Sequence, residues 1–179
     1  MHYCHPHPSP LGPLLLASDG QQLTGLWIEG QKYFGGSLRQ ALVPDPGRPE
    51  FKQAARWLEA YFRGEKPPPA DLALAPQGSA FRQAVWRRLL DIPYGETLTY
   101  GAIARQLAQQ TGKTAVAGQA VGGAVGHNPI SIIIPCHRVV GSNGSLTGYA
   151  GGLHKKIHLL TLEGVDTAKF FLPKTGTAL

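Results

Sequence analysis

The sequence predicts an α+β protein with a small N-terminal α/β domain, built on an antiparallel sheet, and a mostly helical C-terminal domain. Two apolar stretches flank the turn dipeptide Asp19-Gly20, which is typical of a β-hairpin. Apolar residues then recur at helical spacing over 51–62 and again over 81–90. A proline-rich stretch at 65–69 separates the two helical patterns and is the best linker candidate.

The N-terminal domain, residues 1–76, is expected to form the sheet and one helix that covers it. The helix should end near Gly64, because glycine commonly follows the last helical turn. The predicted elements are strands over 9–17 and 23–28, a helix over 51–62, and one more short strand through Leu72 and Leu74.

The C-terminal domain, residues 77–164, is expected to be mostly helical, and residues 165–179 to form a loosely held tail. Ser79 and Thr99 each precede an apolar helical pattern, where a hydroxyl can cap the helix. Two short helices in succession, the second rich in small residues, resemble a helix-turn-helix, although a plain packing unit of helices has the same pattern. The predicted elements are helices over 80–90, from Thr99 onward, over 114–125 and over 153–162, with a buried strand over 130–134 that runs into Cys136.

The composition indicates a folded protein of a reducing compartment. Hydrophobic residues make up 42% of the chain, which suffices for a core and argues against disorder. No apolar run is long enough for a membrane span, and the N-terminus does not resemble an export signal. The two cysteines, Cys4 and Cys136, do not make the disulfide framework of a small secreted domain. We therefore expect a cytoplasmic monomer without membrane contact.

The net charge of +6 falls entirely in the second half of the chain. Residues 1–76 hold seven Lys/Arg and seven Asp/Glu, whereas residues 77–179 hold ten and four. A basic domain beside a neutral one favours a polyanionic partner, with nucleic acid first, although ordinary solubility charge explains the excess equally well.

Cys136 is the best candidate for chemistry. Pro135 interrupts strand pairing just before it, and His137 and Arg138 follow at once, so a base and a cation are near the thiol. Five glycines between 141 and 152 allow a ligand to approach the backbone closely. A buried, inert cysteine is the alternative interpretation of a thiol in an apolar segment.

Attack on carbon needs a thiolate, so a base must remove the proton from Cys136. In an extended segment the side chain of His137 points away from that of Cys136, so we expect a bridging water or a kink at Pro135. A carboxylate that orients the imidazole would complete the relay, and Glu163, just after the last helix, is the best placed.

The segment around Cys136 resembles the active-site signature of the O6-alkylguanine-DNA alkyltransferases, also called methylated-DNA–protein-cysteine methyltransferases. The resemblance extends from Gly78 to Gly164, while the first half resembles the family only through 9–12 and its general layout. The residues that carry it are Pro135-Cys136-His137-Arg138-Val139, preceded by Asn128-Pro129 and followed by Tyr149-Ala150-Gly151-Gly152.

The resemblance implies repair of double-stranded DNA by direct reversal. The alkyl group of O6-alkylguanine, with O4-alkylthymine as a second candidate substrate, would move irreversibly to Cys136 after the helix-turn-helix enters the minor groove and the base is flipped out. No cofactor or metal is implied. The implied catalytic residues are Cys136, His137, Glu163, Tyr100, which donates to the purine, and Asn128, which pins the turn before Cys136. The implied DNA contacts are Gln119, Ala120, Gly123, Thr99 and Arg138, and the implied base pocket comprises Tyr149, Val139, Ala150 and Ser131.

Three positions depart from the family's pattern. Gln119 stands where the family has an intercalating arginine, so it brings no cation into the duplex, and His127 is a candidate helper. Ala150 lacks a hydroxyl that some members carry as serine. Ser131 replaces a proline found in some pocket walls, which is expected to widen the pocket.

A metal site and three other functions are weaker alternatives. His2, Cys4, His5 and His7 have spacings that suit zinc, but partner ligands near the first turn are absent, so we expect a frayed N-terminus instead. A damage sensor of this family would lack the acceptor cysteine. A cysteine hydrolase is disfavoured because nucleophile and base are adjacent, and a transcription regulator has no need of the Pro-Cys-His-Arg sequence.

Overall fold

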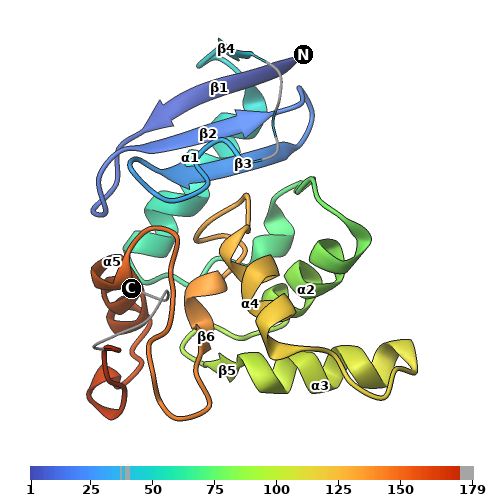
Figure 1. The fold of residues 1–179 in the computed structure, drawn as a ribbon. Coiled ribbons are helices and arrows are strands. Elements are labelled where there is room, and N and C mark those ends of the chain that lie inside the picture. Colours follow the sequence, from blue (N-terminus) through green and yellow to red (C-terminus); the bar gives the residue numbers. More distant parts are fainter. Residues whose placement is uncertain (37, 39–40, 174–179) are drawn as a thin grey trace. The chain divides into compact units, whose positions relative to one another are not determined.

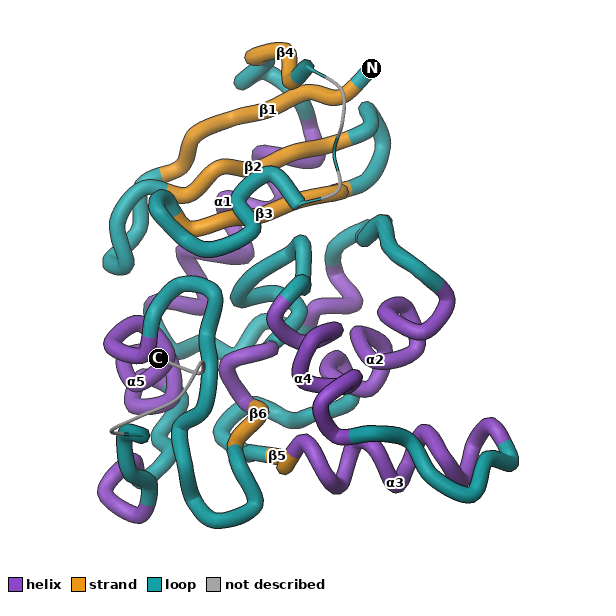
Figure 2. Tube along the Cα trace, viewed as in Figure 1, coloured by secondary structure: helices purple, strands orange, loops and turns teal. Residues whose placement is uncertain are grey.

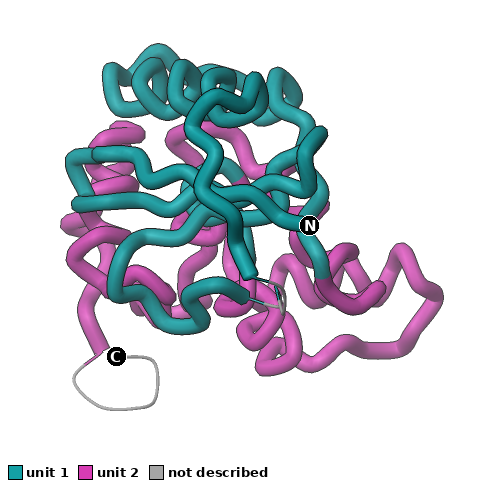
Figure 3. Tube along the Cα trace, turned by 90° about the horizontal axis from the view of Figure 1, so that it is seen from above, with its two compact units in different colours: residues 1–77, 129–133 teal, residues 78–128, 134–179 magenta. Residues whose placement is uncertain are grey.

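The computed structural model describes residues 1–36, 38 and 41–173. The chain divides into two compact units, one of residues 1–77 with 129–133 and one of residues 78–128 with 134–179 (Figure 3). The segment 129–133 therefore belongs to the first unit although it is surrounded in sequence by the second. Within the described residues, no helix has the length and apolar character needed to cross a bilayer.

The first unit is a four-stranded sheet with one helix against it (Figure 1). The predicted hairpin is confirmed, because strands β2 and β3 pair antiparallel around the Asp19-Gly20 turn. The helix α1 buries Phe51, Leu58 and Tyr61, which explains its apolar spacing. The elements are β1 (His2–His7), β2 (Leu14–Ser18), β3 (Leu23–Ile28), β4 (Leu42–Pro44) and α1 (Pro49–Phe62), with the sheet order β3-β2-β1-β4.

The prediction of a frayed N-terminus is wrong. Residues 2–7 form β1, which pairs antiparallel with β2 and parallel with β4, so both of its edges are hydrogen-bonded. Cys4 is buried in this strand. The short strand predicted through Leu74 is reduced to one isolated bridge, made by Leu74 with Leu23.

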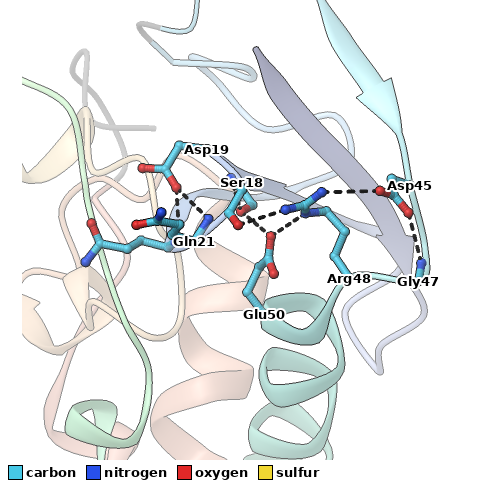
Figure 4. A network of polar contacts seen from close by, with 9 residues as sticks. Ser18, Asp19, Gln21, Asp45, Gly47, Arg48 and Glu50 are labelled. Carbon is cyan, nitrogen blue, oxygen red and sulfur yellow. Dashed lines mark hydrogen bonds and ion pairs between the residues drawn. The ribbon is translucent and has the colours of Figure 1, made fainter.

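A partly buried ion pair stabilises the first unit at the start of α1 (Figure 4). Glu50 Oε1 accepts hydrogen bonds from Ser18 Oγ and from Arg48 Nε, each at 2.6 Å. Arg48 also donates to the carbonyl of Gly20 at 2.7 Å and pairs with Asp45 at 3.3 Å. Arg48 therefore connects the β2–β3 turn, the end of β4 and the beginning of α1.

The second unit packs short helices around a two-stranded parallel pair (Figures 1 and 2). The predicted caps are confirmed: Ser79 Oγ accepts from Arg82 N at 3.3 Å, and Thr99 Oγ1 accepts from Ala102 N at 3.1 Å. The predicted third helix begins four residues late, at Gly118, after a loop that follows the left-handed Gly112. The elements are α2 (Ala80–Leu90), β5 (Leu98–Thr99), α3 (Tyr100–Thr111), α4 (Gly118–Gly126), β6 (Val139–Val140) and α5 (Leu153–Leu162).

Residues 165–173 are not the loose tail that the sequence predicts. Val165 is buried in an apolar cluster with Val140, Leu146 and Leu160. Phe171 donates to Gly144 O at 3.0 Å and accepts from Leu146 N at 2.9 Å, so the segment is tied to the glycine-rich loop. The rest of the predicted tail, 174–179, lies outside the described residues.

Candidate active site

Cys136 does not follow a strand. It begins a 3₁₀ turn, Cys136–Arg138, and the predicted strand over 130–134 is wrong. Within 130–134 only Ile130 makes a bridge, with Leu26 of β3, and the chain turns immediately afterwards. Figure 2 shows this segment between α4 and the 3₁₀ turn as loop.

Two tight turns explain why the strand does not continue. Ile133 N donates to Ser131 O at 2.8 Å around Ile132, whose φ is 71°. Cys136 N donates to Ile134 O at 2.8 Å around Pro135, whose φ and ψ are −83° and 65°. Hydrogen bonds between residues two apart define γ-turns, the second of the inverse kind, and both bend the backbone sharply. The second is a kink at Pro135, one of the two alternatives that the sequence predicts.

Asn128 holds the base of this loop. Its Nδ2 donates to the carbonyl of Ile134 at 2.7 Å. Its side chain also hydrogen-bonds Cys136 and thereby favours the thiolate. One amide thus connects the end of α4 with the reactive residue.

His137 and Glu163 form a buried pair, as the relay requires. His137 Nε2 lies 2.6 Å from Glu163 Oε1, and neither side chain is exposed. Burial lowers the pKa of His137, against the opposing effect of Glu163, so the imidazole is neutral at physiological pH. Glu163 accepts the Nε2 proton in that state, which leaves Nδ1 as the basic nitrogen.

Arg138 lies in the same buried cluster. Its Nε and Nη2 donate to the two oxygens of Glu163 at 2.8 and 3.0 Å, and its Nη1 donates to Ile92 O at 2.6 Å. Only 7% of the residue is exposed. This burial argues against the expected DNA contact, because a phosphate cannot reach a guanidinium that is used internally.

The carboxylate of Glu163 is held from a third side by the turn before α3. Gly95 N donates to Glu163 Oε2 at 3.3 Å, with φ of 81° at Gly95. A Cβ at this position would come within 2.9 Å of the Glu163 carbonyl, so only glycine fits. Burial raises the pKa of Glu163, but His137 and Arg138 outweigh it and lower the value to about 2.

Lys156 is the residue that the sequence analysis missed. Its Nζ is buried and donates to the carbonyls of Val139, Thr147 and Gly148 at 2.6, 3.1 and 3.2 Å. Burial lowers its pKa to about 8, while the charge of Cys136 acts in the opposite direction. A signal was present, because Lys156 shares helical spacing with Leu153, Ile157 and Leu160 and so stands on the apolar face of α5.

The thiol of Cys136 is buried among groups that favour its anion. Burial raises the pKa of Cys136, so the resting thiol is protonated. The side chain of Asn128, the charge of Lys156 and the backbone N–H groups of Cys136 and His137 act against this rise. The site therefore resists ionisation at rest but stabilises a thiolate once a base removes the proton.

Two tyrosines border the thiol. Tyr100 donates to Thr147 O at 3.0 Å, and burial raises its pKa to about 12. The hydroxyl of Tyr149 is buried and makes no hydrogen bond within the described part of the chain. Burial, reinforced by the charge of Cys136, raises its pKa well above 10.

The other expected pocket residues differ in their burial and in their contacts. Ala150 is half-buried, whereas Val139 is buried and its carbonyl is used by Lys156. Ser131 belongs to the first unit, where its Oγ lies 3.3 Å from Gln31 Oε1. Their contact with a base stays a prediction.

The expected DNA-contacting residues of α4 share an exposed surface. Gln119, Ala120 and Gly123 are exposed, while Val121, Ala124 and Val125 are buried against the unit. Trp86 of α2 fixes the buried side by donating to Ala124 O at 2.8 Å. Thr99 is half-buried and caps α3, so its hydroxyl already has a structural use.

The chain matches two family descriptions that together cover nearly all of it. Residues 2–76 match the ribonuclease-like domain of 6-O-methylguanine DNA methyltransferase, and residues 80–165 match its DNA-binding domain. A methylated-DNA–protein-cysteine methyltransferase of Methanosarcina acetivorans is 48% identical over 161 residues, covering 87% of this chain and 94% of that one. The Haemophilus influenzae protein of the same name is 42% identical, covering 89% and 84%.

Solved structures agree with these sequences. The crystal structure of Mycobacterium tuberculosis OGT in complex with DNA has a TM-score of 0.77 and 45% identity, covering 94% of each chain. The O6-methylguanine methyltransferase of the same organism has a TM-score of 0.76, 45% identity, and covers 98% of this chain and 97% of that one. The chain therefore belongs to the 6-O-methylguanine DNA methyltransferase family.

Proposed function

We propose that this protein repairs O6-alkylguanine in double-stranded DNA by transferring the alkyl group to Sγ of Cys136. The observation that carries the proposal is that the Cys136 thiol is buried beside the His137–Glu163 pair. In this pair, His137 Nε2 and Glu163 Oε1 lie 2.6 Å apart. The bond between O6 and the alkyl carbon breaks, a thioether forms, and guanine is left in the DNA. Because the thioether is stable, each molecule acts once. Both cysteines are free thiols, in keeping with a monomer that works in the cytoplasm.

His137 is the general base in this proposal. The thiol is protonated at rest, because burial raises the pKa of Cys136. His137 is neutral, because burial lowers its pKa, and it takes the proton at Nδ1 through a water. Glu163 keeps its negative charge and stabilises the imidazolium that forms.

Lys156 and Tyr100 stabilise the negative charges that develop on the thiolate and on the leaving guanine. Lys156 is protonated below about pH 8, and its charge favours the thiolate. Tyr100 exchanges its hydrogen bond with Thr147 O for one to the flipped guanine, where negative charge appears as the alkyl group leaves. The hydroxyl remains protonated in this role because its pKa is about 12.

DNA binding is assigned to α3 and α4 as a helix-turn-helix in the minor groove. Gln119, Ala120 and Gly123 form the exposed surface of α4, and the small size of Ala120 and Gly123 allows close approach. The damaged nucleotide is flipped out of the stack, because its O6 substituent is otherwise out of reach of a buried thiol. Gln119 fills the gap without adding a charge.

The test is the intact mass of the protein after incubation with an O6-methylguanine duplex. We expect the mass to rise by one methyl group, stoichiometrically, with the modification on Cys136 in the digested peptide. A duplex with O4-methylthymine, run in parallel, decides whether thymine lesions are also substrates. Binding without a mass change would indicate a damage sensor, and repeated turnover would indicate a hydrolase.

Gln119→Arg is expected to tighten DNA binding. An arginine at the exposed first turn of α4 adds a cation near the phosphates, so the slope of log affinity against log salt should steepen by about one. Affinity for one alkylated duplex, measured at several salt concentrations, checks this. As a control, Gln53→Arg adds the same charge at an exposed position of α1 and should change the salt slope less. Equal effects of the two variants would mean that residue 119 does not enter the duplex.

Gly123→Ala is expected to stabilise the protein and weaken DNA binding. A Cβ at Gly123 would meet no atom within 4 Å, and alanine in a helix is favoured over glycine by about 1 kcal/mol. The same methyl group would hold the helix away from the groove. Thermal unfolding and duplex affinity should therefore change in opposite directions, and an unchanged affinity would remove Gly123 from the interface.

A further inference from the structure

The chain reaches Cys136 through a five-residue excursion from one unit into the other. Residues 129–133 belong to the first unit, whereas Asn128 and Ile134 on either side belong to the second. At the base of the excursion, Asn128 Nδ2 donates to Ile134 O at 2.7 Å. At its tip, Leu26 of β3 donates to Pro129 O and accepts from Ser131 N, both at 2.9 Å. The segment is therefore fixed at both ends.

Gln31 strengthens the attachment at the tip. This side chain is 7% exposed, and its Oε1 accepts from Ile28 N at 2.7 Å at the end of β3. The same oxygen lies 3.3 Å from Ser131 Oγ, which can donate to it. One amide oxygen thus connects the last residue of the strand with the excursion.

The attachment holds a strained backbone. Ile132 has a φ of 71° at the centre of a γ-turn, a conformation that β-branched residues rarely adopt. Such strain persists only where surrounding contacts impose it. Ile132 is buried and lies between the Ser131 contact and the inverse γ-turn at Pro135. A change in backbone position at Ser131 therefore reaches Cys136 through residues 133–135, which have little conformational freedom.

We propose that Gln31 and Ser131 are positioning residues for Cys136, so that the edge of the N-terminal sheet sets the reactivity of the acceptor. This inference rests on the proposed function of Cys136. When the Gln31 contact is lost, Ile132 relaxes toward negative φ and Ile134 O shifts away from Asn128 and from Cys136 N. The thiol then loses hydrogen bonds that favour its anion. The exposed residues of α4 are untouched, so DNA binding persists.

The experiment compares Gln31→Ala with Ser18→Ala, a control in the same unit. Ser18→Ala removes two hydrogen bonds, the one donated to Glu50 and the one accepted from Gly20 N, and does not touch the excursion. For each variant we would measure unfolding free energy, duplex affinity, single-turnover transfer at saturating O6-methylguanine duplex, and the pH profile of Cys136 modification by iodoacetamide. Gln31→Ala should slow transfer by about tenfold to a hundredfold, as misplaced reacting groups do. Its affinity should stay within about twofold, because binding lies elsewhere.

The iodoacetamide profile separates positioning from stability. We expect it to shift to higher pH in Gln31→Ala and to match the wild type in Ser18→Ala. Gln31→Glu keeps an acceptor for Ile28 N and Ser131 Oγ and should restore most of the rate. Should Gln31→Ala fail to fold, Ser131→Ala removes the same contact and should shift the profile in the same direction.

Two results would overturn the inference. One is that the test variant, Gln31→Ala or Ser131→Ala, has the same transfer rate and the same iodoacetamide profile as the control Ser18→Ala. The other is a slowing that follows the loss of stability alike in all variants. Failure of the proposed function would look different, because wild-type protein would then gain no methyl group while its iodoacetamide profile stayed measurable.

Discussion

Cys136→Ser abolishes alkyl transfer and leaves the fold and the DNA affinity intact. A serine hydroxyl has nearly the same shape, but the neutral His137 cannot generate an alkoxide as it generates a thiolate, so the nucleophile is lost. The exposed surface of α4 does not involve residue 136, so binding continues. Intact mass after incubation with an alkylated duplex should show no gain, while duplex affinity stays within about twofold of wild type.

Cys4→Ser is the matched control for this result. Cys4 is the other cysteine of the chain and is buried in β1 of the first unit. The variant should transfer at the wild-type rate. Alkyl transfer that survives in Cys136→Ser, onto Cys4 or any other residue, would contradict the assignment of the acceptor.

Glu163→Gln slows transfer by about a hundredfold or more, the range expected when general-base catalysis is impaired. The amide can still accept the Nε2 proton of His137, but without negative charge it does not stabilise the imidazolium. Single-turnover transfer at saturating duplex measures the effect. Duplex affinity should change much less, because Glu163 lies inside the unit.

The same substitution also destabilises the protein, because Glu163 neutralises the buried Arg138. Leaving such a charge without its partner costs about 3–5 kcal/mol. The double variant Arg138→Met/Glu163→Gln removes both charges and should regain part of the stability without regaining the transfer rate. If the rate returned together with the stability, Glu163 would have only a structural role.

Acid unfolding gives an independent signature of Glu163. Its pKa is lowered from 4.5 to about 2 in the folded protein, so its stabilising contribution is complete above pH 4.5 and is lost as the pH falls toward 2. The shift corresponds to about 3 kcal/mol. The difference in unfolding free energy between wild type and Glu163→Gln should therefore shrink over this interval. A difference independent of pH would contradict the lowered pKa.

Local features of the sequence determined much of the fold. Asp19-Gly20 between apolar stretches predicted the hairpin, and the hydroxyls of Ser79 and Thr99 marked the starts of α2 and α3. These signals act over a few residues, because turn and cap hydrogen bonds depend on nearby backbone alone. Cys136 and its basic neighbour were likewise evident from adjacent residues.

Only the tertiary structure decided the surroundings of the thiol. The apolar run over 130–134 has the composition of a strand, yet its contacts with Leu26 and Gln31 hold a γ-turn at Ile132 that no local preference encodes. Lys156 and Arg138 look like surface charges in sequence, and each is buried because distant carbonyls and a carboxylate satisfy its donors. Burial of a charge depends on partners far along the chain, which local sequence patterns do not reveal. The sequence therefore identified Cys136 as the reactive residue, whereas the tertiary structure determined how readily its thiol ionises.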